Sequence, residues 1–196
     1  VPTGATFQPI SVLSNNLIGY STYPFLVTFT GGSITASTFA TRSVITLGAG
    51  NGPMNVSLGD IDGDGKNDLI VAQYATPATN NGIYIYRNTG TVSNVSFATP
   101  VILSPNDYTG AVAGDLDGDG KLDIAVMSNS NVRVYRSTSV PGTISFAPNI
   151  ALTAGNAIKG LYISEIDADG QADIAVNHYP DGVVSLYRNI GEPGSP

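Results

Sequence analysis

Three acidic stretches of the sequence share one spacing: DIDGDGKNDLIV from Asp60, DLDGDGKLDIAV from Asp115 and EIDADGQADIAV from Glu165. We call their first nine residues acidic loops 1, 2 and 3 and number the loop positions from 1 to 9. Carboxylates at positions 1, 3 and 5 converge when the backbone curls around a point, position 7 offers a main-chain carbonyl, and position 9 closes the cage. Such a cage is typical of Ca²⁺, and without a cation its carboxylates would repel one another. The pattern predicts three Ca²⁺ sites, with these ligands: Asp60, Asp62, Asp64, the Lys66 carbonyl and Asp68; Asp115, Asp117, Asp119, the Lys121 carbonyl and Asp123; Glu165, Asp167, Asp169, the Gln171 carbonyl and Asp173.

Glycine at position 6 supports this interpretation, because the sharp turn there needs a left-handed backbone that glycine adopts without strain. Position 4 is glycine in loops 1 and 2 but Ala168 in loop 3, and we interpret this variation as a weaker requirement for glycine, a looser demand on the backbone at position 4. Loop 3 departs most from the pattern, since Glu165 is also one methylene longer than aspartate. A solvated turn is the alternative for any single acidic loop, but three copies in phase favour metal binding.

The residues that come directly after the loops exclude an EF-hand. That motif needs a bidentate Glu at position 12 and flanking helices. Here position 12 is valine inside an aliphatic run in every copy: Val71, Val126 and Val176.

The charge of the chain is concentrated in the same loops. The net charge is −7 over 196 residues, and of the 15 carboxylates only Asp107, Asp181 and Glu192 lie outside the three stretches. Three Ca²⁺ ions would therefore bring the protein close to neutrality. The Lys and Arg residues are scattered singly, which disfavours nucleic-acid binding. The absence of cysteine excludes disulfides and zinc-thiolate sites, and no apolar run is long enough to insert into a membrane.

The elements around the loops recur every 50 to 55 residues, since the loops begin at residues 60, 115 and 165. Each unit has a Phe-led strand, a short apolar segment before the loop, an aliphatic run after it and a last strand ending in Tyr-Arg. Four short antiparallel strands in about 50 residues describe one blade of a β-propeller. We therefore predict an all-β fold with repeats at residues 39–96, 97–145 and 146–196. Residues 1–38 contain two further strand-like segments, LIGYST and PFLVTFTGG, and are a partial blade, a ring-closing strand or the end of a preceding domain.

Catalytic signatures are absent from the sequence. There is no G-x-S-x-G, P-loop, HExxH or thiol, and we expect His178, the single histidine, to have a surface or packing role. Carboxylates committed to a saturated metal cage leave no open position for catalysis, so we predict that the chain is not an enzyme. Tyrosines near strand ends could stack on a sugar or protein surface or pack between blades: Tyr74, Tyr108, Tyr162 and Tyr179. Three Tyr-Arg pairs recur in phase, which indicates a repeated structural role such as blade packing or pairing with loop carboxylates: Tyr86 with Arg87, Tyr135 with Arg136, and Tyr187 with Arg188.

The motif D-[IL]-D-G-D-G-K-x-D-[IL]-x-V resembles FG-GAP/VCBS repeats, the calcium-loop blades of integrin alpha-subunit propellers and of many secreted bacterial proteins. The resemblance covers about residues 39 to 190. It implies a propeller with calcium bound in hairpin loops on one rim. The chain departs from the family in having few blades for a ring and in Glu165 and Ala168 of the third loop.

These observations predict a calcium-binding β-propeller module of an extracellular or surface protein, of bacterial origin, that mediates adhesion or recognises a protein or glycan. An extracellular location is expected because sites with dissociation constants of about 10⁻⁴ to 10⁻³ M would be empty in the cytosol. One alternative is an accessory propeller of a secreted polysaccharide-degrading enzyme. Another is a purely architectural module, in which a homo-oligomer completes the propeller.

Overall fold

The computed structural model describes residues 9–14, 17–24, 33–47, 51–75, 81–92, 94–103, 110–128, 130–155 and 157–191. The chain divides into two compact units, residues 1–48 and 49–196, which we treat separately. Within the described ranges, no helix has the length and apolar character needed to cross a membrane.

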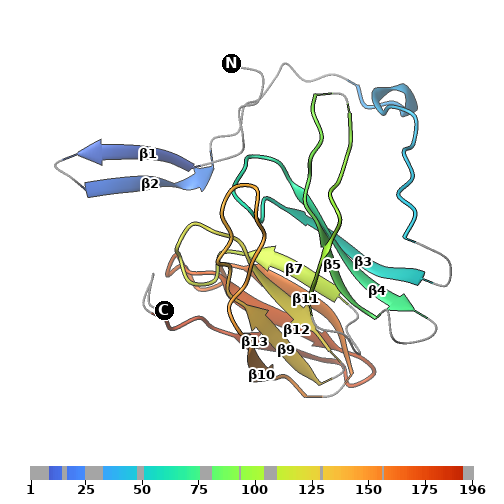
Figure 1. Cartoon of the computed structure of the whole chain (residues 1–196). Coiled ribbons are helices and arrows are strands. Elements are labelled where there is room, and N and C mark those ends of the chain that lie inside the picture. The colour runs from blue at the N-terminus through green and yellow to red at the C-terminus, as the bar shows by residue number, and fades with distance from the viewer. Residues whose placement is uncertain are drawn as a thin grey trace. The chain divides into compact units, whose positions relative to one another are not determined.

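The N-terminal unit contains a β-hairpin and a short helical turn. Strand β1 (Pro9–Ser14) pairs antiparallel with β2 (Leu17–Pro24), and η1 (Ala36–Thr38) is a 3-10 helix. The predicted strand LIGYST is confirmed as part of β2, whereas most of PFLVTFTGG lies outside the described residues. Figure 1 draws this hairpin in blue.

The first Phe-led segment, FATRSVITL at residues 39–47, is not a strand, although we predicted one. It follows η1 as irregular chain, and its large apolar side chains are solvent-exposed, Phe39 at 71% and Val44 at 69%. The reason is that strand propensity alone does not make a strand, which also needs a neighbour for its backbone hydrogen bonds. No strand pairs with this segment within the described part of the chain.

The second unit consists of three antiparallel sheets, which confirms the predicted all-β fold of propeller-type blades (Figure 1). In each sheet, consecutive strands along the chain are neighbours. Blade 1 comprises β3 (Asn51–Gly59), β4 (Asp68–Ala75), β5 (Gly82–Tyr86) and β6 (Val101–Leu103). Blade 2 comprises β7 (Gly110–Gly114), β8 (Asp123–Met127), β9 (Asn131–Tyr135) and β10 (Ile150–Thr153). Blade 3 comprises β11 (Ile158–Ser164), β12 (Asp173–His178) and β13 (Val183–Tyr187).

The sheets are offset by one strand from the sequence repeats. The Phe-led segments at residues 97–103 and 146–152 hydrogen-bond to the strand before them, so each forms the fourth strand of the preceding blade. Two equivalent hydrogen bonds fix this pairing: Ala98 N donates to Arg87 O, and Ala147 N donates to Arg136 O, both at 2.9 Å. Blade 3 has three strands among the described residues, and β11 and β13 are its edge strands.

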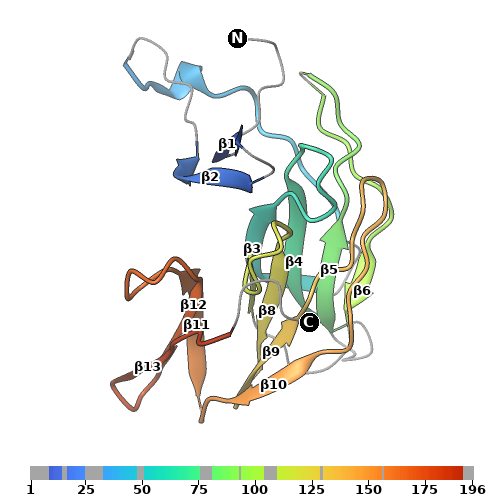
Figure 2. The ribbon, with the colours of Figure 1, turned by 90° about the vertical axis from the view of Figure 1, so that its left-hand side faces the viewer.

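Two hydrophobic cores lie between the blades, the first between blades 1 and 2 and the second between blades 2 and 3. Strand β8 contributes to both, because successive side chains point to opposite faces of a strand. Ile124 and Val126 enter the first core, while Ala125 and Met127 enter the second. All five residues of β8 are buried, as its uninterrupted aliphatic run predicts. Figure 2, turned by 90°, shows β3 to β5 beside β8 to β10.

The outer face of blade 3 differs from what its sequence pattern predicts. Alternating apolar residues in the last strand of each repeat predict one packed face, and Ile83 and Ile85 of blade 1 are fully buried. Val184 and Leu186 of blade 3 are instead 64% and 60% exposed, because they point away from the second core and no described strand covers them.

Candidate metal centre

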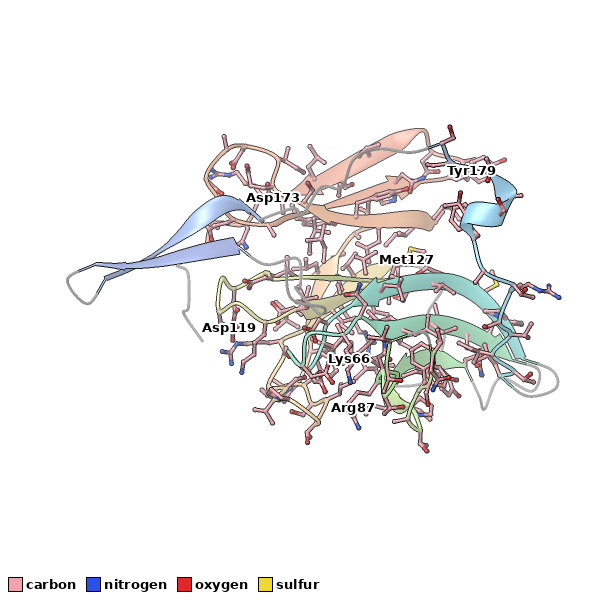
Figure 3. The ribbon with its side chains drawn as sticks, turned by 90° about the horizontal axis from the view of Figure 1, so that it is seen from above. Lys66, Arg87, Asp119, Met127, Asp173 and Tyr179 are labelled. Atoms are coloured by element: carbon pink, nitrogen blue, oxygen red, sulfur yellow. The ribbon has the colours of Figure 1, made fainter. Side chains whose placement is uncertain are left out.

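Each acidic loop joins the first two strands of its blade, β3 to β4, β7 to β8 and β11 to β12. Position 9 is the first residue of the second strand, so the strand pairing anchors one end of each loop. Figure 3 labels one residue in each loop, Lys66, Asp119 and Asp173.

The structure brings the carboxylates at positions 1, 3 and 9 together in all three loops. Each contributes one oxygen to a group whose atoms lie within 4.8 Å of one another: Asp60, Asp62 and Asp68; Asp115, Asp117 and Asp123; Glu165, Asp167 and Asp173. Three convergent carboxylates of this kind could hold a hard divalent cation. Asp64, Asp119 and Asp169 at position 5 lie outside these groups. The full ligand assignment made from the sequence, including the carbonyls at position 7, stays a prediction.

Position 5 carries out a different task in the structure. Its Oδ1 atom accepts the backbone N–H of position 7, from Lys66 to Asp64 at 2.9 Å, from Lys121 to Asp119 at 2.9 Å, and from Gln171 to Asp169 at 2.8 Å. In loops 1 and 2, position 3 likewise accepts the N–H of position 5, at 3.1 Å in both. These short-range hydrogen bonds hold the loop curled, which is the shape that makes the carboxylates converge.

Position 9 is the buried centre of each loop. Asp68, Asp123 and Asp173 are at most 1% exposed. One oxygen accepts the N–H of position 2, at 3.0, 3.0 and 2.9 Å for Ile61, Leu116 and Ile166. The other accepts the N–H of the residue after Tyr-Arg, at 2.7 Å in each blade: Asn88, Ser137 and Asn189. One side chain therefore ties the start of the loop to the end of the third strand.

This second partner was not predicted from the sequence. An Asn or Ser does come directly after each Tyr-Arg pair. The group that donates to position 9 is a backbone N–H, however, so the hydrogen bond does not require a particular side chain and the sequence pattern does not reveal it. Asn189 does more than donate its N–H, since its Nδ2 atom also donates to the carbonyl of Leu116 in loop 2 at 2.7 Å. Similarly, Gly142 N of blade 2 donates to Asp62 Oδ2 of loop 1 at 2.8 Å. Loops 1 and 2 are thus each supported by the following blade.

The arginines of the three Tyr-Arg pairs lie close to loop carboxylates. Pairing with these carboxylates is one of the two roles predicted for them. Arg87 Nη1 is 3.9 Å from Asp64 Oδ2, and Arg188 Nη1 is 3.3 Å from Asp167 Oδ2. Arg136 is closest, with Nε 2.5 Å from Asp117 Oδ2, and this pairing raises the pKa of its guanidinium. Figure 3 shows Arg87 projecting near Lys66 of loop 1.

Backbone conformation is more restrictive at position 4 than the sequence indicated. Position 6 has positive φ in all loops, 88° at Gly65, 85° at Gly120 and 86° at Gly170, as predicted. Position 4 is left-handed too, with φ of 72° at Gly63 and Gly118 and 67° at Ala168. The interpretation of a looser demand at position 4 is therefore wrong. Ala168 adopts a conformation that costs an L-residue about 1 to 2 kcal/mol.

The electrostatics of loops 1 and 2 favour a bound cation. Burial, followed by the charges of neighbouring loop aspartates, raises the pKa of Asp68, Asp115 and Asp123 above their ordinary range, against hydrogen bonds that lower it. Asp60 Oδ1 is a buried carboxylate oxygen with no hydrogen-bond partner. A buried acceptor of this kind is costly unless it is satisfied, and a cation would satisfy it. The donor set consists of hard oxygens, so these residues fit Ca²⁺.

The residues considered for catalysis or surface contact are not members of the three carboxylate groups. His178 is buried in β12 and its Nε2 atom lies 3.0 Å from Ser185 Oγ, which is consistent with a packing role. Tyr74, Tyr162 and Tyr179 are exposed, whereas Tyr108 lies outside the described residues. Of the Tyr-Arg tyrosines, Tyr135 is buried in the first core and Tyr187 packs against the second.

Comparison with known proteins identifies a repeat family and a distant relative. The model of the FG-GAP-like repeat matches three overlapping segments, residues 17–71, 60–126 and 115–176. Cartilage acidic protein 1 of Mus musculus is 26% identical over 133 residues, which cover 63% of this chain and 20% of that protein. The chain thus spans about a fifth of the length of this relative. No solved structure shows significant similarity.

Proposed function

Because the chain belongs to the family of FG-GAP-like repeats, we propose that it is a calcium-stabilised β-propeller module that recognises protein or glycan ligands outside the cell and has no catalytic activity of its own. The observation that carries this proposal is the threefold convergence of carboxylates at positions 1, 3 and 9 of the loops. Asp60 Oδ1, a buried oxygen without a donor, supports a cation in loop 1 in particular.

Calcium would act on the fold rather than on a substrate. Position 9 connects each loop to the third strand of its blade, and Asp62 accepts a hydrogen bond from Gly142 of the next blade. A cation that draws positions 1, 3 and 9 together would therefore stabilise the pairing within a blade and the contact between blades. At a calcium concentration tenfold above the dissociation constant, each site would add about 1.4 kcal/mol to the free energy of unfolding.

The ligand-binding role rests on the exposed aromatic side chains. Tyr74, Tyr162 and Tyr179 are between 56% and 68% exposed and lie on or beside strands. An exposed tyrosine offers an apolar ring for stacking and a hydroxyl for hydrogen bonding, which suits a sugar or a protein surface. Millimolar extracellular calcium suits loops of this type, and the relative named for cartilage is compatible with that location. A bacterial source stays a prediction.

The test combines metal stoichiometry with stability and binding. Native mass spectrometry should show up to three Ca²⁺ per chain, and a thermal melt should shift upward with Ca²⁺ and downward with EDTA. Mg²⁺ at equal concentration is the control for ionic strength. Glycan arrays and pull-downs with and without Ca²⁺ then test recognition, with the triple variant Tyr74→Ser, Tyr162→Ser, Tyr179→Ser as the matched control. A melt unaffected by chelation would contradict the calcium proposal, and binding unchanged in the tyrosine variant would contradict the recognition surface.

The alternative of an enzyme accessory differs from this proposal in the identity of the ligand. Such a module would bind the polysaccharide that its enzyme degrades but would release no product by itself. Turnover of a polysaccharide by the 196-residue chain alone would overturn the non-catalytic proposal.

A further inference from the structure

The acidic loops of blades 2 and 3 are joined by the side chain of Asn189. Its Nδ2 atom donates to the carbonyl of Leu116, at position 2 of loop 2, at 2.7 Å, and to the carbonyl of Ala172, at position 8 of loop 3, at 3.1 Å. Its backbone N–H donates to Asp173, at position 9 of loop 3, at 2.7 Å. One residue therefore contacts both loops, although it belongs to neither.

This contact leads from one group of convergent carboxylates to the next. The carbonyl of Leu116 accepts from Asn189, while the N–H of Leu116 donates to Asp123 Oδ2, at position 9 of loop 2, at 3.0 Å. Asp123 and Asp173 each belong to a carboxylate group that could hold a cation, and each is 1% exposed. Two residues and three hydrogen bonds thus connect these two buried carboxylates.

The equivalent residues of the other two blades bond within their own blade. Asn88 occupies this place in blade 1, where its Nδ2 atom donates to the carbonyl of Asn67, at position 8 of its own loop, at 2.9 Å. Ser137 occupies it in blade 2, where its hydroxyl donates to Ser139 at 3.0 Å. Of these three described residues, Asn189 alone has a side chain that bonds to the loop of a neighbouring blade. The link is thus a feature of loops 2 and 3 and not of the repeat.

We propose that Asn189 couples calcium binding in loops 2 and 3, so that occupation of either loop raises the affinity of the other. This coupling rests on the proposed function, because it requires Ca²⁺ in both loops. Repulsion among the carboxylates of an empty loop opposes the convergence in which Asp173 accepts the N–H of Asn189. The same holds for Asp123 and the N–H of Leu116 in loop 2. Occupation of one loop therefore orders residues on which the other loop also depends, so the second ion has less of the chain to order and binds more tightly.

The sign of the coupling distinguishes this link from the direct effect of charge. Two divalent cations in neighbouring loops repel each other, so charge alone would make the second ion bind more weakly, and added salt would reduce that effect. A structural link acts in the opposite direction and persists in salt. We define the coupling factor as the affinity of one loop with the other filled, divided by its affinity with the other empty. Because the link depends on one hydrogen bond between neutral groups, from Asn189 to Leu116, we expect a coupling factor of about three to ten.

Calorimetric titration of the 196-residue chain with Ca²⁺ measures this factor when the loops are disabled in turn. Asp60→Asn removes a carboxylate of the first group, so that loops 2 and 3 are titrated together. Addition of Asp167→Asn leaves loop 2 alone, and addition of Asp117→Asn instead leaves loop 3 alone. The two-ion binding constant of the Asp60→Asn chain, divided by the product of the two single-loop constants, is the coupling factor. Thermal melts in Ca²⁺ check that each variant is folded.

The variant Asn189→Ser tests the residue itself. Serine is the residue that blade 2 carries at this place, as Ser137, and its side chain is too short to replace the bridge to Leu116. The backbone N–H that Asp173 accepts is kept, so we expect the coupling factor to fall to about one or below. Asn88→Ser is the matched control, because Asn88 makes the same contacts within its own blade, and it should leave the factor unchanged. A merely structural role of Asn189 would lower the single-loop constants and leave the factor unchanged as well.

Native mass spectrometry gives a second readout that needs no disabled loop. At half-saturation with Ca²⁺, Asn189→Ser should raise the share of partly loaded chains above that of the natural sequence, and Asn88→Ser should not. Equal shares in the two variants, a coupling factor of one or less at high salt in the chain that retains Asn189, or a factor that survives Asn189→Ser would overturn the coupling and leave calcium binding intact. A chain that takes up no Ca²⁺ would instead overturn the proposed function and the coupling together.

Discussion

Arg136 donates from its Nε atom to Asp117 Oδ2 at 2.5 Å, which places a guanidinium against a carboxylate of the second metal group. Its Nη2 atom is also 3.6 Å from Asp119 Oδ2. Arg188 approaches Asp167, at position 3 of loop 3, in the same way, whereas Arg87 approaches Asp64 at position 5 of loop 1, outside the convergent group. The repeat thus carries its own positive charge beside each acidic loop, and we expect that charge to compete with a divalent cation for the loop carboxylates.

Removal of this competitor should strengthen calcium binding. In Arg136→Met, the aliphatic part of the side chain is kept and the charge is lost, so the affinity of loop 2 for Ca²⁺ should rise by roughly three- to tenfold at low salt and by less at high salt. The stability without calcium should fall slightly. Titration calorimetry measures the affinity, and Lys159→Met, at an exposed position of β11, is the control. Equal affinity in Arg136→Met would show that the arginine does not compete with the ion, and weaker affinity would show that it assists the ion.

The two kinds of loop carboxylate should respond differently to neutralisation. Asp123 is buried and both of its oxygens accept backbone N–H groups, so Asp123→Asn places an NH₂ group against a donor. We expect a loss of about 2 to 4 kcal/mol in the free energy of unfolding, with or without calcium. Asp119 is exposed and lies outside the convergent group, so Asp119→Asn should change the metal-free stability little and should reduce the calcium response through the loss of one negative charge beside the site. Urea unfolding in EDTA and in Ca²⁺ distinguishes the two variants. If both lost the same free energy of unfolding in EDTA, the two carboxylates would not differ as proposed.

The sequence predicted the features that depend on local chemistry. The three loops, their glycines and the alternation of β8 follow from residue type and spacing, because turn conformation and side-chain direction are local properties. The sequence did not predict which sheet takes each Phe-led segment. FATPVIL has the same strand pattern whether it begins one blade or ends another, and the choice depends on its hydrogen-bonding neighbour, β5.

Two further differences have the same non-local origin. The role of Asp68 as a double acceptor depends on the N–H of Asn88, 20 residues away, which places no demand on a side chain. Val184 and Leu186 follow the pattern of buried strands, yet burial requires a neighbouring surface that their own sequence does not encode. Loop 3 shows the same effect at position 2, where Ile166 is 49% exposed although Ile61 of loop 1 is buried in the first core.

Loop 3 should gain stability from a single glycine. Ala168 has φ of 67°, where Gly63 and Gly118 have 72° in the other loops. Ala168→Gly should relieve this strain and raise the free energy of unfolding by up to about 1 kcal/mol, part of the gain being lost to the greater freedom of glycine in the unfolded chain. The converse variant, Gly63→Ala, should lose a similar amount, because a Cβ there meets nothing within 4 Å and only the backbone opposes it. Urea unfolding in saturating Ca²⁺ measures both, and a destabilised Ala168→Gly would contradict the strain argument.

The pH dependence of stability should reverse when calcium is added. Burial is the main cause that raises the pKa of Asp68, Asp115 and Asp123 above the ordinary value of 3.8, so the folded protein binds protons more tightly than the unfolded chain does. In metal-free buffer, the contribution of these three groups to the free energy of unfolding should therefore be fully present below pH 3.8. This contribution should be lost as pH rises through their raised pKa values. Calcium binds the ionised carboxylates, so the stabilisation that it provides should grow over the same pH range. Urea unfolding at a series of pH values, in calcium-free buffer and in Ca²⁺, checks both slopes, and Asp115→Asn should flatten each of them. A metal-free protein whose stability rises through this range would show that the loop carboxylates are held ionised by something other than a metal ion.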